Sequence, residues 1–380
     1  MIKIRLLVLI SFFTLAFSCT DDNLIDPVKD DTEAEAETPE EPEEPEEVPE
    51  EVPEEEPEEP ATEAPNPPDS GNEWSDFKIP ADAGTDKVWQ LEEDISDDFE
   101  YEFAGKSTLT EFGSGKWTNF YHNAWDGPGT TKWVHENVTV TDGKLSLITS
   151  RVEGETKAYN GSTGTLVDKA TRLGCITSTK RVKYPVYVET RVKAANAFFA
   201  SDIWMLSPDD TQEIDILEAY GAQNPRNEQT WFGERFHISH HVFIRDPFAD
   251  YQPKDASTWQ QIDGYPFVSS DWVTIGVYWK SPTYLEYYLN GNLIKVMDNL
   301  DTVDGKDGID PLGYTSASTP PNTSDRTGLN KEMDIIINAE VQDWNAEKGR
   351  MPTDEEIANY PDDHTLKIDW IRIYKPVDAN

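Results

Sequence analysis

The sequence predicts an all-β protein whose main part is one antiparallel β-sandwich of roughly 300 residues. Two observations predict this fold. Short segments rich in β-branched and aromatic residues are bounded by Gly, Pro, Asn or Asp, which is the pattern of strands separated by turns. Helical periodicity is nearly absent, and no unit of twenty to fifty residues repeats. A sandwich of this length typically has long strands and large loops around a cleft.

The predicted strands follow one another from residue 144 to residue 374. They are Lys144–Thr149, Arg181–Val192, Glu213–Tyr220, Phe236–Phe243, Trp272–Trp279, Tyr284–Asn290, Asn292–Met297, Met333–Ala339 and Leu366–Tyr374. Asn290-Gly291 predicts a two-residue hairpin, because both residues readily adopt the positive φ of a type I′ turn. The best helix candidate, Thr353–Asn359, is short.

The first 18 residues read as a secretory signal peptide. Lys3 and Arg5 precede an apolar run from Leu6 to Phe17, which is too short to span a bilayer and is followed by the small residue Ser18. Cys19 directly after this small residue predicts a lipobox, in which Cys19 is acylated and becomes the first residue of a lipoprotein. The alternative is an ordinary signal peptide followed by an incidental cysteine.

Residues 19–72 are predicted to be a disordered, Pro/Glu-rich acidic linker. Residues 20–63 contain 22 acidic residues and one basic residue, with a proline at every third or fourth position of the Glu-Glu-Pro repeats. Such a segment cannot bury enough apolar surface to become ordered, so we expect a spacer between a membrane and the domain 73–380. The net charge of the whole chain is −42, which argues against nucleic-acid partners.

Cys175 is the only cysteine besides Cys19. Lipidation of Cys19 would leave no intramolecular disulfide, so the domain must be stable through its core alone. We expect Cys175 to be a buried small hydrophobe rather than a catalytic thiol.

The run Glu213-Ile-Asp-Ile-Leu-Glu218 carries the sharpest chemical signal. In a strand, Glu213 and Asp215 share one face and the two isoleucines occupy the other, which belongs to the core. Glu218 would point to the wrong face unless one extra residue, a β-bulge, returns it. Two carboxyls on one face suit retaining glycoside hydrolysis, which needs a nucleophile and an acid about 5–5.5 Å apart. A calcium site or an ordinary polar strand face remains open at this point.

Aromatic and histidine residues add to this signal. Trp204 precedes the acidic strand and Trp125 lies in a Gly/Pro-rich loop, and exposed indoles stack on the apolar faces of sugars. Trp279 and Trp370 lie in predicted strands and are expected in the core. The stretch His237-Ile-Ser-His-His241 places three histidines close together, and we favour sugar contacts from His241 and Arg245 over zinc ligation.

The acidic run matches the Glu-x-Asp-x-x-Glu signature of glycoside hydrolase family 16, which the chain resembles over roughly residues 76–377. The surrounding runs are similar to β-agarases of that family; they are His122–Gly129, Ser201–Tyr220, His237–Pro253, Thr327–Glu340 and Asp369–Pro376. The resemblance implies a jelly-roll, concanavalin-like sandwich with a concave cleft and a retaining mechanism. The residues between Ala222 and Glu234 do not align with the family.

The resemblance also implies individual roles. Glu213 would be the nucleophile, Asp215 its helper and Glu218 the acid/base. Glycan contacts would come from Asn123, Trp125, Trp204, His241, Arg245 and Glu340. Asp369 would bind a structural calcium together with backbone carbonyls, and no cofactor is implied for catalysis.

The expected function is endo-hydrolysis of agarose or a related red-algal galactan by a monomeric, outer-membrane lipoprotein at the cell surface. Porphyranase or κ-carrageenase activity is an alternative within the family, although sulfated substrates would favour a basic cleft. A non-catalytic galactan-binding lipoprotein and a surface adhesin are alternatives of other classes.

Overall fold

The computed structural model describes residues 78–223, 230–245, 248–253, 256–298 and 328–379. The predicted signal peptide, Cys19 and the acidic linker lie outside the described residues. Within these ranges no helix is both long and apolar enough to cross a membrane.

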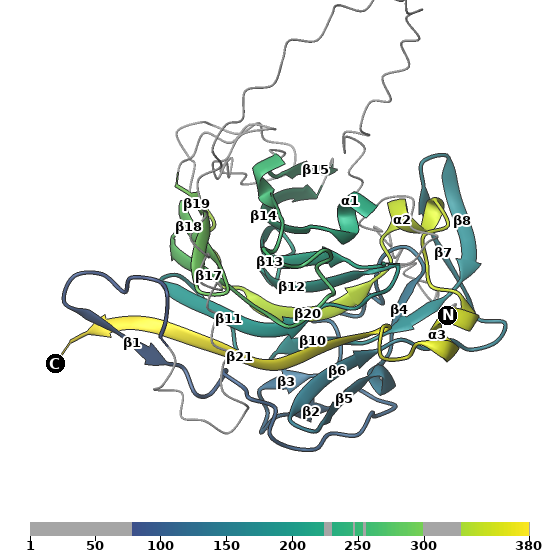
Figure 1. Cartoon of the computed structure of the whole chain (residues 1–380), viewed down its shortest axis with the longest axis horizontal. Helices are drawn as coiled ribbons and strands as arrows, with labels where there is room; N and C mark the ends of the chain where they lie inside the picture. The colour runs from purple at the N-terminus through teal and green to yellow at the C-terminus, as the bar shows by residue number, and fades with distance from the viewer. Residues whose placement is uncertain (1–77, 224–229, 246–247, 254–255, 299–327, 380) are drawn as a thin grey trace, which may run out of the picture. The chain divides into compact units, whose positions relative to one another are not determined.

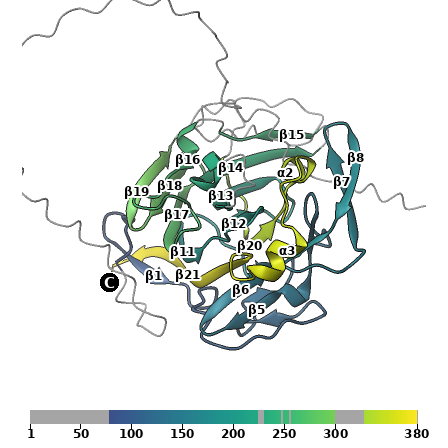
Figure 2. The same cartoon turned by 45° about the vertical axis from the view of Figure 1, so that its right-hand side comes forward.

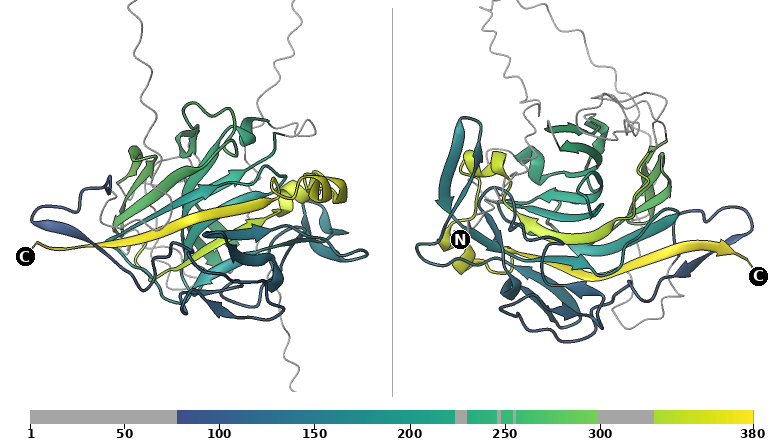
Figure 3. Two further views of the ribbon diagram at one scale, coloured as in Figure 1. Left: turned by 60° about the horizontal axis from the view of Figure 1, so that its bottom comes forward. Right: turned by 180° about the vertical axis from the view of Figure 1, so that it is seen from behind.

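Two antiparallel sheets pack face to face (Figure 1). In the described residues the outer sheet has the order β19-β18-β17-β11-β21-β6-β5, and β1 also pairs with β21. Its strands are β19 (Asn292–Met297), β18 (Tyr284–Leu289), β17 (Val273–Ser281), β11 (Val186–Lys193), β21 (Thr365–Asp378), β6 (Lys144–Ile148), β5 (Val138–Thr141) and β1 (Lys87–Leu91). The long β21 runs along the centre of this sheet toward the C-terminal end, where β1 lies beside it (Figure 3).

The second sheet, called the cleft sheet here, has the order β15-β14-β13-β12-β20-β10-β3-β2, with β16 paired to β14. Its strands are β15 (Phe248–Tyr251), β14 (Phe236–Arg245), β13 (Gln212–Tyr220), β12 (Ala200–Leu206), β20 (Asp334–Glu340), β10 (Cys175–Ser178), β3 (Trp117–Thr118), β2 (Glu111–Phe112) and β16 (Trp259–Gln260).

Smaller elements surround the sandwich. They are the parallel pair β4 (Thr131–Trp133) and β9 (Thr171–Leu173), the hairpin β7 (Thr156–Gly161) and β8 (Gly164–Lys169), the helices α1 (Thr230–Gly233), α2 (Asp343–Glu347) and α3 (Asp354–Asn359), and the 3-10 turns η2 (His135–Asn137) and η3 (Ala256–Thr258). The β7–β8 hairpin rises beside α2 (Figure 2), and Asn160 donates its backbone N–H to Asp343 of α2 at 3.1 Å.

All nine predicted strands are present, with boundary shifts of a few residues at most of them. The Asn290-Gly291 turn is also confirmed, since the φ angles of these residues are 47° and 76°. The predicted helix is α3, and Thr353 caps it by accepting a hydrogen bond from the Glu356 backbone N–H.

The core between the sheets is formed by alternate strand residues. Ile214, Ile216 and Leu217 of β13 are fully buried in it, together with Trp279 of β17. Trp370 and Cys175 are also buried, as predicted. Burial of the β13 isoleucines fixes the strand's register, because a slip of one residue would move its acids into the core.

Candidate active site

The predicted bulge occurs in β13. Opposite β12, Asp215 pairs with Trp204 and Leu217 pairs with Ile203, so Ile216 is the extra residue. On the β14 side the register also shifts between Asp215 and Glu218. The bulge returns Glu218 to the face of Glu213 and Asp215, and all three line one cleft.

His241 lies next to the first two acids. Its Nε2 is 3.1 Å from Asp215 Oδ2 and 3.9 Å from Glu213 Oε1, while its Nδ1 is 2.8 Å from Asp250 Oδ1. Burial opposes the charged imidazole, but the charges of Asp250 and Asp215 and their hydrogen bonds raise the pKa of His241 well above its usual value. His241 therefore carries a positive charge beneath the acids, and the sugar contact expected of it stays a prediction.

Glu218 has different partners. It accepts hydrogen bonds from His237 Nδ1 at 2.7 Å and from the Tyr220 hydroxyl at 3.1 Å. The His237 ring is itself held by Thr258 at 3.0 Å and by stacking on Trp259. These contacts fix the orientation of the carboxyl that the family resemblance implies as acid/base.

Proton affinities differ among the three acids. Burial, followed by the charge of Asp215, raises the pKa of Glu213 well above its usual value. Burial and then the charge of Glu218 raise the pKa of Asp215. For Glu218 burial acts in the same direction, but the hydrogen bond and charge of His237 outweigh it and lower the pKa. In the unliganded cleft Glu213 and Asp215 therefore hold a proton more readily than ordinary carboxyls, while Glu218 holds one less readily.

The predicted aromatic residues line the same cleft. Trp204 is partly exposed opposite Asp215, and its ring is nearly parallel to that of Tyr121. Trp125 packs edge-on against Tyr121 and Trp133. Asn123 Oδ1 accepts a hydrogen bond from the Trp125 backbone N–H at 2.8 Å. This bond helps to hold the loop that carries Trp125.

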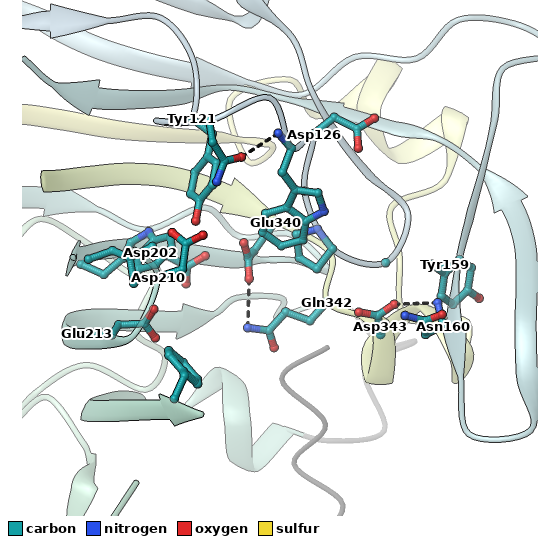
Figure 4. A pocket seen from close by; sticks show the side chains of 18 of the residues that line it. Tyr121, Asp126, Tyr159, Asn160, Asp202, Asp210, Glu213, Glu340, Gln342 and Asp343 are labelled. Carbon is teal, nitrogen blue, oxygen red and sulfur yellow. Dashed lines mark hydrogen bonds between the residues drawn. The ribbon is translucent and has the colours of Figure 1, made fainter. Parts of the chain in front are cut away.

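Asn338 of β20 connects several cleft side chains. Its side-chain oxygen accepts a hydrogen bond from Trp204 Nε1 at 2.6 Å, and its Nδ2 donates to Asp202 and to Glu340, both at 3.1 Å. Glu340 also accepts from Gln342 Nε2 at 3.1 Å (Figure 4). Burial is the main cause that raises the pKa of Glu340 to about 8, so Glu340 is mostly a neutral acid at neutral pH.

Arg245 lines the cleft from β14, on the other side of β13 and β12 from Glu340 on β20. It donates from Nη2 to the carbonyl oxygen of Asp210, and its guanidinium lies 4.5 Å from the centre of the Phe243 ring. His122 holds the Asp210 side chain through Nε2 at 2.8 Å. Arg245 lines the cleft, and the contact with sugar expected of it stays a prediction.

The histidine stretch does not form a zinc site of three histidines in the described part of the chain. The group there with metal-ligand geometry is Glu213, Asp215 and His241, whose ligand atoms lie within 4.8 Å of one another. Two of these are the acids of the predicted reaction, and His237 bonds Glu218 instead.

The surroundings of Asp369 do not fit the implied calcium site. Its Oδ2 is 2.6 Å from Arg191 Nη1, and its Oδ1 is 3.9 Å from Lys144 Nζ. Asp369 is almost fully buried, so the guanidinium supplies the charge that a calcium ion would otherwise provide. The contacts of Asp369 therefore favour a buried ion pair between β21 and β11, and the metal expected there stays a prediction.

Chelation distinguishes the ion pair from a metal site. A metal that binds the native state stabilises it by mass action, so its removal by EDTA would lower the melting temperature. With an ion pair at Asp369 and no metal to remove, we expect EDTA to change the melting temperature by less than about 1 °C. Arg191→Met should lower the melting temperature, since it leaves the Asp369 carboxylate buried without its main partner. Calcium-dependent melting of the wild-type protein would contradict the ion-pair assignment.

Several cleft residues were not predicted from the sequence. They are Asp202, Asp210, Gln342, Lys157 and the residues around Tyr159 and Asn160, together with the buried Asn338 that holds Asp202 and Glu340 from behind. Asp202 and Trp204 alternate along β12, as do Asn338 and Glu340 along β20, so strand alternation was a signal that could have found them. The β7–β8 hairpin has few strand-forming residues, and its position beside the cleft is a tertiary feature.

The fold and the site together define a class. A concave sheet with three carboxyls on one bulged strand and with indoles beside them is the arrangement of a sandwich-type glycoside hydrolase. A family model described as "Beta-porphyranase A-D, GH16 domain" matches residues 89–376. The chain belongs to glycoside hydrolase family 16.

Individual β-agarases are similar to this chain over most of its length. β-Agarase B of Zobellia galactanivorans is 47% identical over 318 residues, covering 80% of this chain and 83% of that protein. A β-agarase of Phocaeicola plebeius is 47% identical over 315 residues, covering 83% and 93%. A crystal structure of an inactivated mutant of β-agarase B in complex with agaro-octaose aligns with a TM-score of 0.69 at 45% identity, covering 80% of this chain and all of that one.

Proposed function

We propose that this protein is an endo-acting, retaining β-agarase that cleaves the β-1,4 linkages of agarose. The observation that carries the proposal is the bulged β13, which presents Glu213, Asp215 and Glu218 to one open cleft in a chain 47% identical to two β-agarases.

Both glutamates have defined roles in the proposed reaction. Glu213 attacks the anomeric carbon, and Glu218 protonates the leaving oxygen. Asp215 shares a proton with Glu213, so the proton can reside on Asp215 while Glu213 attacks as a carboxylate. Glu218 then removes a proton from the water that hydrolyses the glycosyl-enzyme intermediate.

The cleft suits internal cleavage of a polymer. It extends from Phe248 on β15 across β14, β13, β12 and β20 to Asn160 on β7, so a chain of several sugars can cross the sheet. Figure 4 shows Asp202, Asp210 and Glu213 in one part of this cleft and Tyr159, Asn160 and Asp343 in another.

The charge of the cleft favours neutral agarose over sulfated galactans. The acidic residues that line it are Asp126, Asp202, Asp210, Glu213, Asp215, Glu218, Glu340 and Asp343, and the cations are Lys157 and Arg245. Lys157 Nζ already donates to Asp126 at 2.9 Å and to the carbonyl oxygen of Gly127 at 2.5 Å, and Arg245 donates to the Asp210 carbonyl oxygen. A sulfate ester would therefore meet mostly negative or acidic groups.

Substrate comparison tests the proposed function. The chain from residue 70 onward is incubated with agarose, porphyran, κ-carrageenan and laminarin, and the products are separated by chromatography. We expect a ladder of neutral oligosaccharides from agarose that shortens with time. Binding to agarose without release of reducing ends would favour a non-catalytic binding protein, and faster hydrolysis of a sulfated galactan would overturn the assignment of substrate.

Trp204 gives a prediction for substrate binding. We expect Trp204→Ala to raise KM for agarose about fivefold, because loss of a stacking surface costs on the order of 1 kcal/mol. Trp204→Phe is the matched control, since it keeps an aromatic face while it also removes the indole bond to Asn338. Equal KM values for wild-type and Trp204→Ala proteins would show that no sugar stacks there.

For the residues before the domain we propose a lipid anchor at Cys19 and a display function for the acidic spacer. The order of charged, apolar and small residues before Cys19 supports this proposal. Agarose is too large to enter a cell intact, so an agarase gains from exposure at the outer surface. Metabolic labelling with a fatty acid, abolished by Cys19→Ala, tests the anchor.

A further inference from the structure

Asp202 is an acidic residue of the cleft to which the mechanism above gives no role. It lies on β12 directly opposite Glu218 on β13 and opposite Asn338 on β20. Residues directly opposite in an antiparallel pair have Cβ atoms about 4.5–5.5 Å apart. Asp202 and Glu218 also line the same cleft, so their carboxyl groups are neighbours (Figure 4 shows Asp202).

The contacts of Asp202 favour the neutral acid. Its Oδ2 accepts one hydrogen bond, from the uncharged amide of Asn338, and its buried Oδ1 has no hydrogen-bond partner among the described residues. Within that part of the chain Asp202 has no ion pair with any Lys, Arg or His. A buried carboxylate with one neutral donor and no cation is costly, so the group holds a proton.

The acidic groups around Asp202 also favour its neutral form. The titratable groups that face it are Glu340 from β20, Glu218 and Asp215 from β13, and the thiol of Cys175 from β10. Burial is the largest cause that raises the pKa of Asp202 well above its usual value, and Glu340 and Glu218 add to it by charge repulsion whenever they are ionised.

Glu218 shows the opposite arrangement. It receives hydrogen bonds from His237 and Tyr220, which stabilise the carboxylate. Yet the proposed reaction requires Glu218 to deliver a proton to the leaving oxygen. The proton that the reaction uses is therefore not stored on Glu218 in the unliganded site.

We propose that Asp202 is the positioning residue that stores this proton and passes it to Glu218 when substrate binds; the inference rests on the proposed glycosidase function. The O–H bond of Asp202 breaks and an O–H bond forms on Glu218, directly or through one water, which leaves Asp202 as the carboxylate. Glu218 then gives the proton to the leaving oxygen as the glycosidic C–O bond breaks. In the second half-reaction water gives its hydroxyl to the anomeric carbon and its proton to Glu218, and this proton returns to Asp202.

The pH profile of Asp202→Asn tests this proposal. Asparagine keeps the size and the acceptor for Asn338 but removes the stored proton. In the wild-type protein the unpaired, buried Asp202 helps the pair Asp202 and Glu218 to hold one proton, whereas in the variant Glu218 has no acid opposite it on β12. We expect the alkaline limb of kcat/KM on agaro-oligosaccharides to move down by about one pH unit or more, and kcat at neutral pH to fall at least tenfold, with KM within about threefold of wild type.

Controls separate this proposal from other causes. Asp142→Asn, at an exposed turn, should leave the profile unchanged. Where Asp202→Asn does not fold, Asp202→Ala is assayed with added formate, which should restore kcat by supplying a small carboxylic acid. A wild-type pH profile in Asp202→Asn, a loss confined to KM, or no rescue by formate would overturn the proposal. Failure of the wild-type protein to cleave any galactan would instead overturn the proposed function.

Discussion

Replacing Glu213 by glycine lowers kcat on agarose by about 10⁴-fold or more in our account, because no other described carboxyl occupies the position of the nucleophile. The fold should survive, since the side chain lies at the cleft surface and the adjacent Ile214 and Ile216 hold β13 in the core. Added azide should restore cleavage by attacking the anomeric carbon from the side that Glu213 vacates.

The product of this rescue identifies the role of Glu213. Attack from that side yields an α-glycosyl azide, which proton NMR distinguishes from the β-anomer. Wild-type-like turnover of Glu213→Gly, or a β-glycosyl azide as the rescue product, would contradict the assignment of the nucleophile. Melting temperatures of wild type and variant serve as the control for folding.

Replacing Glu218 by alanine should lower kcat on agarose by about 10³-fold or more, because the leaving oxygen of a sugar is a poor leaving group without a proton donor. An agaro-oligosaccharide with an aryl leaving group of low pKa needs no such proton, so its glycosylation step should be affected far less. With azide present, the intermediate on Glu213 should be intercepted to give the β-glycosyl azide.

This second variant separates the two glutamates. An equal loss on agarose and on the aryl glycoside would show that Glu218 is not the acid. His237→Gln is a useful comparison, since it keeps a hydrogen-bond donor near Glu218 while it removes the imidazole.

Local signals in the sequence were sufficient to predict the central strand of the site. Ile214 and Ile216 had to be buried, so the acids had to face the cleft, and only an extra residue returned Glu218 to their face. The structure confirms this bulge at Ile216. Burial of Cys175 and the Asn290-Gly291 turn were predicted for similarly local reasons.

The remaining features depend on partners that are distant in the sequence. Asp369 resembled a calcium ligand until the structure placed Arg191, which lies 178 positions away, against its carboxylate. Asp202 has a role only because β12 lies between β13 and β20, which supply Glu218 and Asn338. Strand pairing of this kind cannot be deduced from hydrophobic alternation in a single strand.

The central claim is that Glu213 forms a covalent bond to the substrate within a double displacement. An agaro-oligosaccharide with fluorine at C2 of the reacting galactose and a good leaving group should trap this intermediate, because fluorine slows its hydrolysis. Mass spectrometry of the digested protein should find one glycosyl adduct, on the peptide that contains β13, at Glu213. An adduct at Glu218, or steady turnover of the reagent with inversion at the anomeric carbon, would contradict the account.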